Sequence, residues 1–127
     1  MRQSGVLAAA GIVALDKMRD RLVDDHVNAR LLAEGVATIP GVELDPEMVQ
    51  TNIVVFDVSK TELSAQEVVA RLRRREVLAN NIDGHRVRLV THKDVSRQDC
   101  LNAVEIMNEV LRLQADSNGC LGVLESQ

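Results

Sequence analysis

Aromatic residues are almost absent from this sequence, since Phe56 is the only one among 127 residues. Proteins that bind single-stranded nucleic acid stack bases on several aromatic side chains, so the composition disfavours that class. The net charge of −4 also argues against a nucleic acid or an anionic membrane as the main partner. We therefore expect no nucleic-acid partner, no membrane partner, and a core built from aliphatic side chains.

Cysteine is equally scarce, and the two thiols, Cys100 and Cys120, are too few for a disulfide framework. Cys100 falls on the apolar side of a predicted helix, whereas Cys120 lies in a tail that contains glycine and serine. We interpret them as one buried and one loose thiol in a reducing compartment such as the cytoplasm. The three histidines, His26, His85 and His92, lack the spacing of a metal site, so we predict no metal.

No apolar run is long enough to span a bilayer. The run Gly5–Leu15 follows Arg2 and contains three consecutive alanines, which are features of a signal peptide. The alanines lie inside the run, however, and charged residues in helical register begin at Asp16. We interpret the run as the start of a buried helix. Because it is apolar on every side in so small a domain, we expect its outer faces to contact something outside this chain.

The pattern of residues 4–39 predicts a long helix, continuous or broken near Asp24-Asp25 and ended by Pro40-Gly41. Its apolar stripe includes Leu15, Met18, Leu22, His26, Ala29, Ala33 and Val36. We interpret His26 as a structural histidine that bonds to its acidic neighbours.

The rest of the sequence predicts short strands and two helices. Strands are predicted at Val42–Leu44, Thr51–Val58, Val77–Ala79 and Arg86–Val90, and helices from the capping signals at Ser64 and Ser96. This order predicts an α+β fold, in which a long N-terminal helix precedes a short, mainly antiparallel sheet with helices on one face. We divide the chain into a linking helix or helix pair (1–39), a small domain (40–114) and a disordered tail (115–127).

Arg86 and Arg88 alternate with apolar residues on one predicted strand, so both should point to the same open sheet face. A guanidinium on a strand favours an anionic partner, and its planar fork suits a carboxylate or phosphate. Lys60, just after a strand, could form a Schiff base or be a solvated lysine, and we favour the second. His92 could be catalytic, but a hydrogen bond to the turn backbone is favoured.

Three segments together resemble low-specificity L-threonine aldolases. They are Met1–Gly11, Gln50–Ile53 and Arg88–Ser96, and the likeness extends to about Leu113 in the same order. The resemblance implies a pyridoxal-phosphate enzyme of the aspartate-aminotransferase fold type. Such enzymes work as dimers or tetramers and cleave β-hydroxy-amino acids such as threonine to glycine and an aldehyde. It also implies that this chain corresponds to the linking helix and the C-terminal small domain, without the large domain that carries the Schiff-base lysine.

By the same resemblance, Arg88 would bind the α-carboxylate of the amino-acid substrate. Arg2 would approach the cofactor phosphate across a dimer, whereas Lys60 does not align with the Schiff-base lysine. The chain alone would then bind no cofactor and would need the missing large domain or intact subunits, as part of a homo-oligomer. The alternative is a non-catalytic α+β module for interaction or oligomerisation, from a truncated isoform or a pseudogene.

Overall fold

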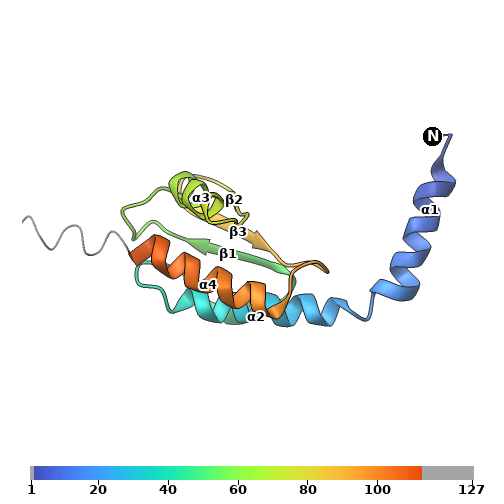
Figure 1. Ribbon diagram of the computed structural model, residues 1–127, viewed down its shortest axis with the longest axis horizontal. Helices are drawn as coiled ribbons and strands as arrows, with labels where there is room; N and C mark the ends of the chain where they lie inside the picture. The colour runs from blue at the N-terminus through green and yellow to red at the C-terminus, as the bar shows by residue number, and fades with distance from the viewer. Residues whose placement is uncertain (1, 113–127) are drawn as a thin grey trace, which may run out of the picture.

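The structure is a computed structural model that describes residues 2–112 (Figure 1). Its elements follow nearly the predicted order: α1 (Ser4–Val13), the π-helical η1 (Ala14–Met18), α2 (Leu22–Ala37), the 3-10 helix η2 (Pro46–Met48), β1 (Ile53–Asp57), α3 (Ala65–Arg74), β2 (Asn80–Asn81), β3 (Arg86–Val90) and α4 (Arg97–Arg112). The predicted tail, 115–127, lies outside the described residues. The division of the chain into domains therefore stays a prediction.

The three strands form an antiparallel sheet in the order β1-β3-β2, so β3 lies in the middle. The strand predicted at Val42–Leu44 is reduced to one bridge between Glu43 and Asp57, because Asp45 and the following proline begin η2. The strand predicted at Val77–Ala79 is displaced to Asn80–Asn81. There the N–H of Val77 bonds to the carbonyl of Leu72 at the end of α3, so it is not free for the sheet.

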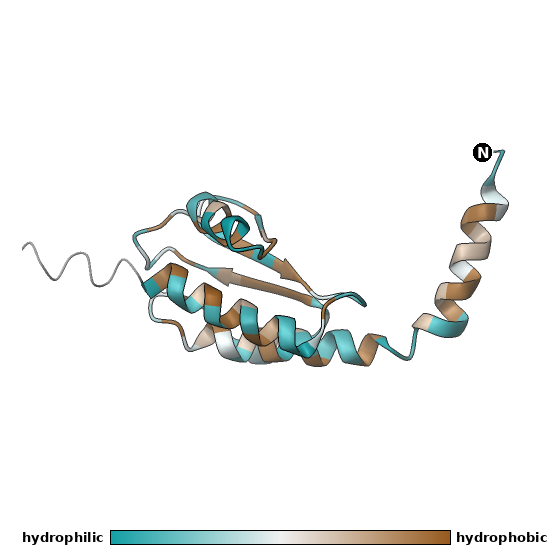
Figure 2. Cartoon of the chain, in the orientation of Figure 1, coloured by the Kyte–Doolittle hydropathy of each residue, from teal (hydrophilic) through white to brown (hydrophobic). Residues whose placement is uncertain are grey.

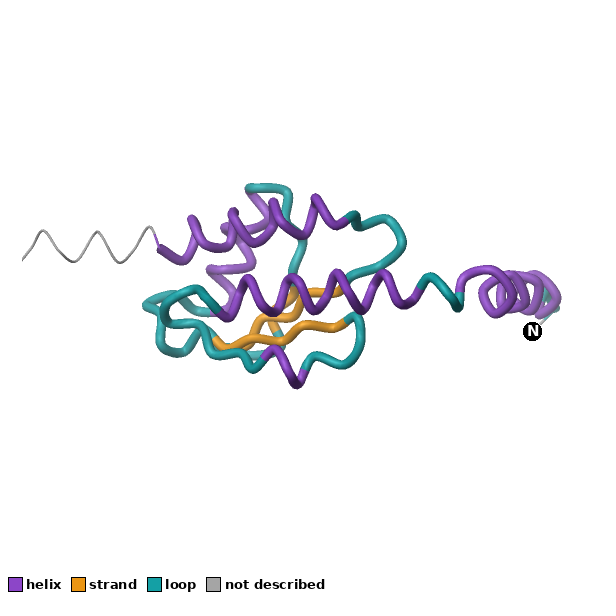
Figure 3. Tube along the Cα trace, turned by 90° about the horizontal axis from the view of Figure 1, so that it is seen from below, coloured by secondary structure: helices purple, strands orange, loops and turns teal. Residues whose placement is uncertain are grey.

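One face of the sheet is covered by helices, and this part of the predicted fold is confirmed. Alternate strand residues are buried beneath α2, α3 and α4: Val54, Phe56, Val87 and Leu89. Helices α2 and α4 run side by side along the sheet, and α3 completes the layer next to α4 (Figures 1 and 3). The lone aromatic ring, Phe56, is fully buried in this aliphatic core.

Both predicted helix starts are confirmed by their hydrogen bonds. The Ser64 hydroxyl accepts the N–H of Glu67 at 3.3 Å, and the Glu67 carboxylate accepts the N–H of Ser64 at 3.0 Å. Ser96 and Asp99 make the same reciprocal pair at the start of α4, at 3.2 and 2.9 Å. These bonds satisfy backbone N–H groups that have no partner within the helix. Because both partners lie within three residues, the capping motif could be recognised from the sequence.

The N-terminal helical segment departs from two expectations. The break lies at Arg19–Arg21 and not near Asp24-Asp25. Helix α1 forms as predicted, but residues 2–17 are all exposed, so the expected burial is not provided by the rest of the described chain. Figure 2 shows this apolar helix standing away from the sheet and its helices. Among residues 2–112, no helix combines the length and apolar character needed to cross a membrane.

The burial of His26 was predicted wrongly. His26 is exposed on α2, and the polar residues that this helix buries are Asp25 and Asn28. Two hydrogen bonds from Arg21, at 2.8 and 3.2 Å, satisfy the Asp25 carboxylate. Asn28 donates to the carbonyl of Val95 at 3.2 Å. The predicted stripe is confirmed at Ala29, Ala33 and Val36, whereas at the start of α2 the buried residue is Asp25 in place of His26. The i, i+4 spacing of Arg21 and Asp25 was the overlooked signal.

Adjacent residues on β3 offer a test of the two-faced sheet. We expect Leu89→Ala to lower the free energy of unfolding by about 2–5 kcal/mol, because it leaves a cavity beneath the helices. Val90→Ala, one residue further on the open face, should cost less than about 1 kcal/mol. Urea denaturation of the full chain measures both values. Equal losses at the two positions would contradict the one-sided core.

Candidate functional site

The prediction that Arg86 and Arg88 share a face is confirmed. Along β3 the exposed residues alternate with the buried Val87 and Leu89. Since Val87 and Leu89 point into the helix layer, both arginines project from the opposite, uncovered face. The site is therefore carried by the central strand of the sheet, whose backbone is held by hydrogen bonds to a neighbour on each side.

Arg88 stands in the middle of a row that crosses the sheet. Its partner on β1 is Val55, and its partner on β2 is Asn80. Directly opposite side chains in an antiparallel pair lie about 5 Å apart at their Cβ atoms. The side chain of Arg88 therefore lies between that of Val55, which is half-buried, and that of Asn80, which is exposed. Such a row combines a cation, an amide hydrogen-bonding group and an apolar wall.

The two arginines differ in their hydrogen bonds. The Nε of Arg86 donates to Asp83 Oδ2 at 2.7 Å. Within residues 2–112, the Arg88 side chain makes no hydrogen bond or ion pair. An anion that reaches this face from outside the described chain would therefore find Arg88 available and Arg86 already paired.

The turn before β3 explains why Arg86 is occupied. Asp83 Oδ1 accepts the backbone N–H groups of His85 and Arg86 at 2.9 and 2.8 Å. The bond from the His85 backbone, followed by those from the Arg86 side chain and backbone, lowers the pKa of Asp83 from 3.8 to about 2. The Asp83 carboxylate consequently stays charged and holds the Arg86 guanidinium against the turn.

The far end of β3 is held by a reciprocal pair that sequence reasoning missed. The Thr91 N–H donates to the Asn52 carbonyl at 2.9 Å, and the Asn52 amide donates to the Thr91 carbonyl at 2.8 Å. The buried Thr91 hydroxyl donates to the carbonyl of Asp25 at 2.7 Å. These bonds join β1, β3 and α2 beside the site. Only the order of two segments distant in sequence brings Asn52 and Thr91 together.

His92 takes the structural role that was favoured for it. Its Nδ1 accepts the backbone N–H of Asp94 at 3.3 Å, and its side chain is exposed. Near it, a cavity of about 250 Å³ is lined by Leu78, Val90, His92 and Cys100, among others. Burial raises the pKa of the Cys100 thiol, as expected for a packed thiol and not for a nucleophile.

Lys60 and Arg2 do not join Arg88 in one site. Lys60 is 65% exposed, and its Nζ pairs with Glu43 Oε1 at 2.5 Å. That hydrogen bond raises the pKa of Lys60, opposite to what a Schiff-base lysine needs. Arg2 is exposed near the N-terminal end of α1, away from the sheet (Figure 1).

The described residues do not by themselves fit a complete pyridoxal phosphate site. The sequence has three lysines, Lys17, Lys60 and Lys93, and all three are exposed. A Schiff-base lysine is usually activated by desolvation or by a cationic neighbour, and the described structure gives these three neither. Within residues 2–112 there is likewise no cluster of three or more potential metal-ligating histidine, cysteine or acidic side chains.

Comparison with known proteins relates the chain to a family of lyases. Residues 1–59 match the family model of the β-eliminating lyases. The chain is 34% identical over 100 residues to low-specificity L-threonine aldolase 1 of Arabidopsis thaliana. It is 40% identical over 98 residues to the low specificity L-threonine aldolase of Escherichia coli K12. These alignments cover 78% and 77% of this chain but only 28% and 27% of the relatives.

A solved structure shares the fold. The structure of MppP soaked with the product 2-ketoarginine superposes with a TM-score of 0.61 at 19% sequence identity. The match covers 78% of this chain and 30% of that one. At this identity the likeness supports the α+β arrangement alone.

The bonds to Asp83 can be tested by titration. We expect Asp83 to titrate near pH 2 in the folded chain, below its usual value, so that it binds fewer protons than in the unfolded chain. Its contribution to stability is then complete above about pH 4 and is lost as the pH falls toward 2. Carbon-13 NMR of the carboxyl measures this pKa.

The matched variant for this titration is Arg86→Ala, which removes one of the three bonds to Asp83 and leaves the two from the backbone. The pKa should then rise part of the way toward 3.8. An unchanged low pKa in the variant would show that Asp83 does not hold the Arg86 guanidinium.

Proposed function

Because residues 1–59 match the family model of the β-eliminating lyases and low-specificity L-threonine aldolases are its relatives, we propose that the chain serves as the small-domain part of a threonine-aldolase-like enzyme. The reaction would be the cleavage of L-threonine, L-allo-threonine and similar β-hydroxy-amino acids to glycine and an aldehyde. In this proposal Arg88 binds the α-carboxylate of the substrate. The observation that carries the proposal is the unpaired guanidinium of Arg88 beside the paired one of Arg86.

Arg88 has the chemistry that a carboxylate clamp needs. Its planar fork can donate two parallel hydrogen bonds to the two carboxylate oxygens, which sets orientation as well as affinity. The central strand holds the Cα of Arg88 in place, so little backbone freedom is lost on binding. A substrate held in this way has a fixed rotation about the bond from nitrogen to Cα, which aligns the bond to be broken.

The rest of the reaction would depend on groups beyond these 127 residues. Pyridoxal phosphate is the electron acceptor used in such lyases, but the described residues do not form its site. The chain spans just over a quarter of the length of its threonine aldolase relatives. We therefore propose that it acts together with a large domain or with intact subunits. Arg2, at the start of α1, would approach the cofactor phosphate only in such an assembly.

The isolated chain should be inactive. With pyridoxal phosphate and L-threonine, we expect no glycine and no new cofactor absorbance band, because all three lysines are exposed and none is activated. Amino-acid analysis and absorption spectroscopy measure the two. The Escherichia coli relative provides the positive control, and glycine formation by this chain above the rate with free cofactor would refute the proposal.

The role of Arg88 is testable in a chimera. Residues 2–112 would replace the matching segment of the Escherichia coli enzyme, to which the chain is 40% identical over 98 residues. In an active chimera, Arg88→Ala should lower kcat/KM for L-threonine by about 10²- to 10³-fold, since it leaves a carboxylate without its charged partner. Arg88→Lys should recover only part of the loss, because an ammonium group cannot bind two oxygens as a planar fork does.

Arg86→Ala is the matched control, since it removes the neighbouring guanidinium from the same face of β3. Its kcat/KM should change less than about threefold, because Arg86 is already paired with Asp83. Equal losses for the Arg86 and Arg88 variants would contradict the assignment. So would an active chimera that tolerates Arg88→Ala.

A second candidate function is a non-catalytic α+β module that associates with other subunits. The exposed apolar surface of α1 favours it. Size-exclusion chromatography of the full chain tests this candidate. A chain that elutes as a monomer would argue against a module whose role is association through α1.

A further inference from the structure

Asn80 lies directly opposite Arg88 on the open face of the sheet. The two residues are Cα partners in the pairing of β2 with β3. The Ile82 N–H donates to the Arg86 carbonyl at 2.9 Å, and this bond lies two residues away in the same register. Hydrogen-bonded pairs of an antiparallel ladder recur at every second residue, so Asn80 and Arg88 form such a pair, with Cα atoms about 5.5 Å apart. Their side chains therefore project side by side from one face.

The side-chain amide of Asn80 is free to bind a ligand. Asn80 is exposed, and within residues 2–112 its side chain makes no hydrogen bond or ion pair. The amide carries two N–H donors. The stem of Arg88 is long enough to bring its guanidinium level with the shorter Asn80 side chain, with an anion between the two. An unpaired amide and an unpaired guanidinium on neighbouring strands can thus donate to one and the same anion.

The uncharged neighbours of Arg88 are what leaves its guanidinium available. Arg86, two residues earlier, pairs with the carboxylate of Asp83. The two residues opposite Arg88, by contrast, are Val55 and Asn80, and neither is acidic. An aspartate in place of Asn80 would present a carboxylate to Arg88 as Asp83 does to Arg86. The neutral amide instead leaves the guanidinium unpaired and places a donor next to it.

One guanidinium and one amide suit an anion that carries a single negative charge. A carboxylate can accept two hydrogen bonds from the planar fork of an arginine and a third from an amide, because its two oxygens offer about four acceptor positions. A phosphate dianion would keep part of its charge unpaired beside the apolar side chain of Val55. The pair of Arg88 and Asn80 is therefore better suited to a carboxylate than to a phosphate.

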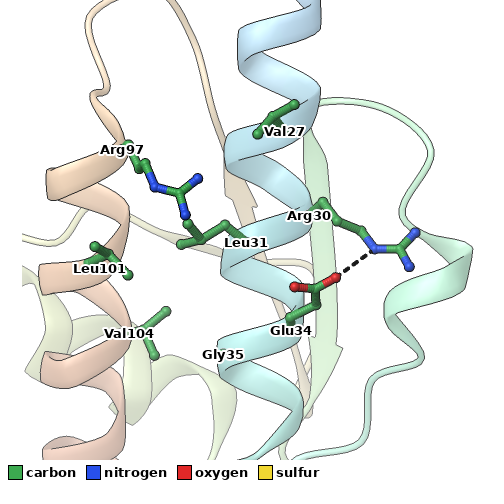
Figure 4. Close-up of a pocket in the computed structure, with 8 residues that line it drawn as sticks. All are labelled: Val27, Arg30, Leu31, Glu34, Gly35, Arg97, Leu101 and Val104. Carbon is green, nitrogen blue, oxygen red and sulfur yellow. Dashed lines mark hydrogen bonds and ion pairs between the residues drawn. The ribbon is translucent and has the colours of Figure 1, made fainter.

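Arg97 is another arginine that makes no hydrogen bond or ion pair within residues 2–112, but its surroundings differ. Figure 4 shows its side chain reaching across the groove between α2 and α4, beside Leu31. Glu34 also lines this groove, and the other arginine there, Arg30, is already paired with Glu34 at 3.0 Å. An anion at Arg97 would meet apolar and acidic side chains and no free second donor in the groove. Two free donors side by side thus distinguish the surroundings of Arg88.

We propose that Asn80 is a second substrate-binding residue, whose amide donates a hydrogen bond to the same α-carboxylate that Arg88 binds. This inference rests on the proposed function and adds to it a residue from β2. Val55, on the β1 side, supplies an apolar contact and no side-chain hydrogen bond. The carboxylate is then held by donors from two adjacent strands, β2 and β3.

The active chimera with the Escherichia coli enzyme tests the role of Asn80. Asn80→Ala should raise KM for L-threonine by about tenfold with little change in kcat, because a bond to the carboxylate is present both before and during the reaction. Asn80→Asp should raise KM by at least about 100-fold, because the new carboxylate would pair with Arg88 and repel the substrate. The inhibition constant for glycine, which has the same carboxylate and no hydroxyl, should rise by the same factors.

Asn81 provides a matched control, since it has the same side chain one residue further along β2. It lies opposite Val87, whose side chain enters the core, so Asn81 projects from the other face of the sheet although it is also exposed. Asn81→Ala and Asn81→Asp should each change KM by less than about threefold. Thermal unfolding shows whether each variant still folds. Equal increases in KM at Asn80 and Asn81 would overturn the proposal.

Carbon-13 NMR of the full chain tests the placement of Asn80 without any catalysis. In Asn80→Asp, the guanidinium of Arg88 should lower the pKa of the introduced carboxyl, because a nearby opposite charge favours the ionised form. Adding Arg88→Ala to this variant should raise that pKa again. A pKa that Arg88→Ala leaves unchanged would overturn the proposal, even where the chimera is inactive.

The kinetic results separate the failure of this inference from the failure of the proposed function. An active chimera that tolerates Arg88→Ala contradicts the proposed function, and the role of Asn80 falls with it. A chimera that loses about 10²-fold or more in kcat/KM with Arg88→Ala, but changes by less than about threefold with Asn80→Ala, overturns the role of Asn80 alone.

Discussion

The alternation of side chains along β3 is the constraint on which the rest of the structure depends. Val87 and Leu89 enter the core beneath the helices, and this forces Arg86 and Arg88 onto the other face. A shift of the pairing by one residue would bury both guanidinium groups and expose the apolar pair, at a cost the small core could not offset. The hydrophobic core therefore sets the position of the cationic site.

Asp83 pairs with one of the two arginines, Arg86, and leaves the other, Arg88, unpaired. Its carboxylate is held by two backbone N–H groups and by Arg86, which keeps it charged and occupied. Arg88, two residues further along the strand, makes no bond to this turn and lies opposite Val55 and Asn80 in the strand pairing. A local hydrogen-bonded turn thus selects which cation remains for an external anion. Within the proposed function, that anion is the α-carboxylate of an amino-acid substrate.

The fold of the described chain leaves part of its apolar surface uncovered. The core beneath the sheet is complete, yet α1 and the outer side of α2 and α4 remain uncovered. Helix α1 has no charged residue between Gln3 and Leu15, whereas the groove between α2 and α4 is lined by charged as well as apolar side chains. The molecule therefore has an open sheet face that carries the unpaired Arg88, and separate uncovered apolar side chains on α1 and on the outer side of the helix layer.

The sequence by itself determined the features that depend on near neighbours. The capping pairs at Ser64 and Ser96, the shared face of Arg86 and Arg88, and the helical form of α1 follow from spacing alone. Only the tertiary structure decided which polar residues are buried and which groups from distant segments bond to one another. Thr91 and Asp25 come together from segments 66 residues apart, a contact that no local pattern encodes. The physical reason is that capping, alternation and close ion pairs are set within a few residues, whereas burial and long-range hydrogen bonds depend on which distant elements pack together.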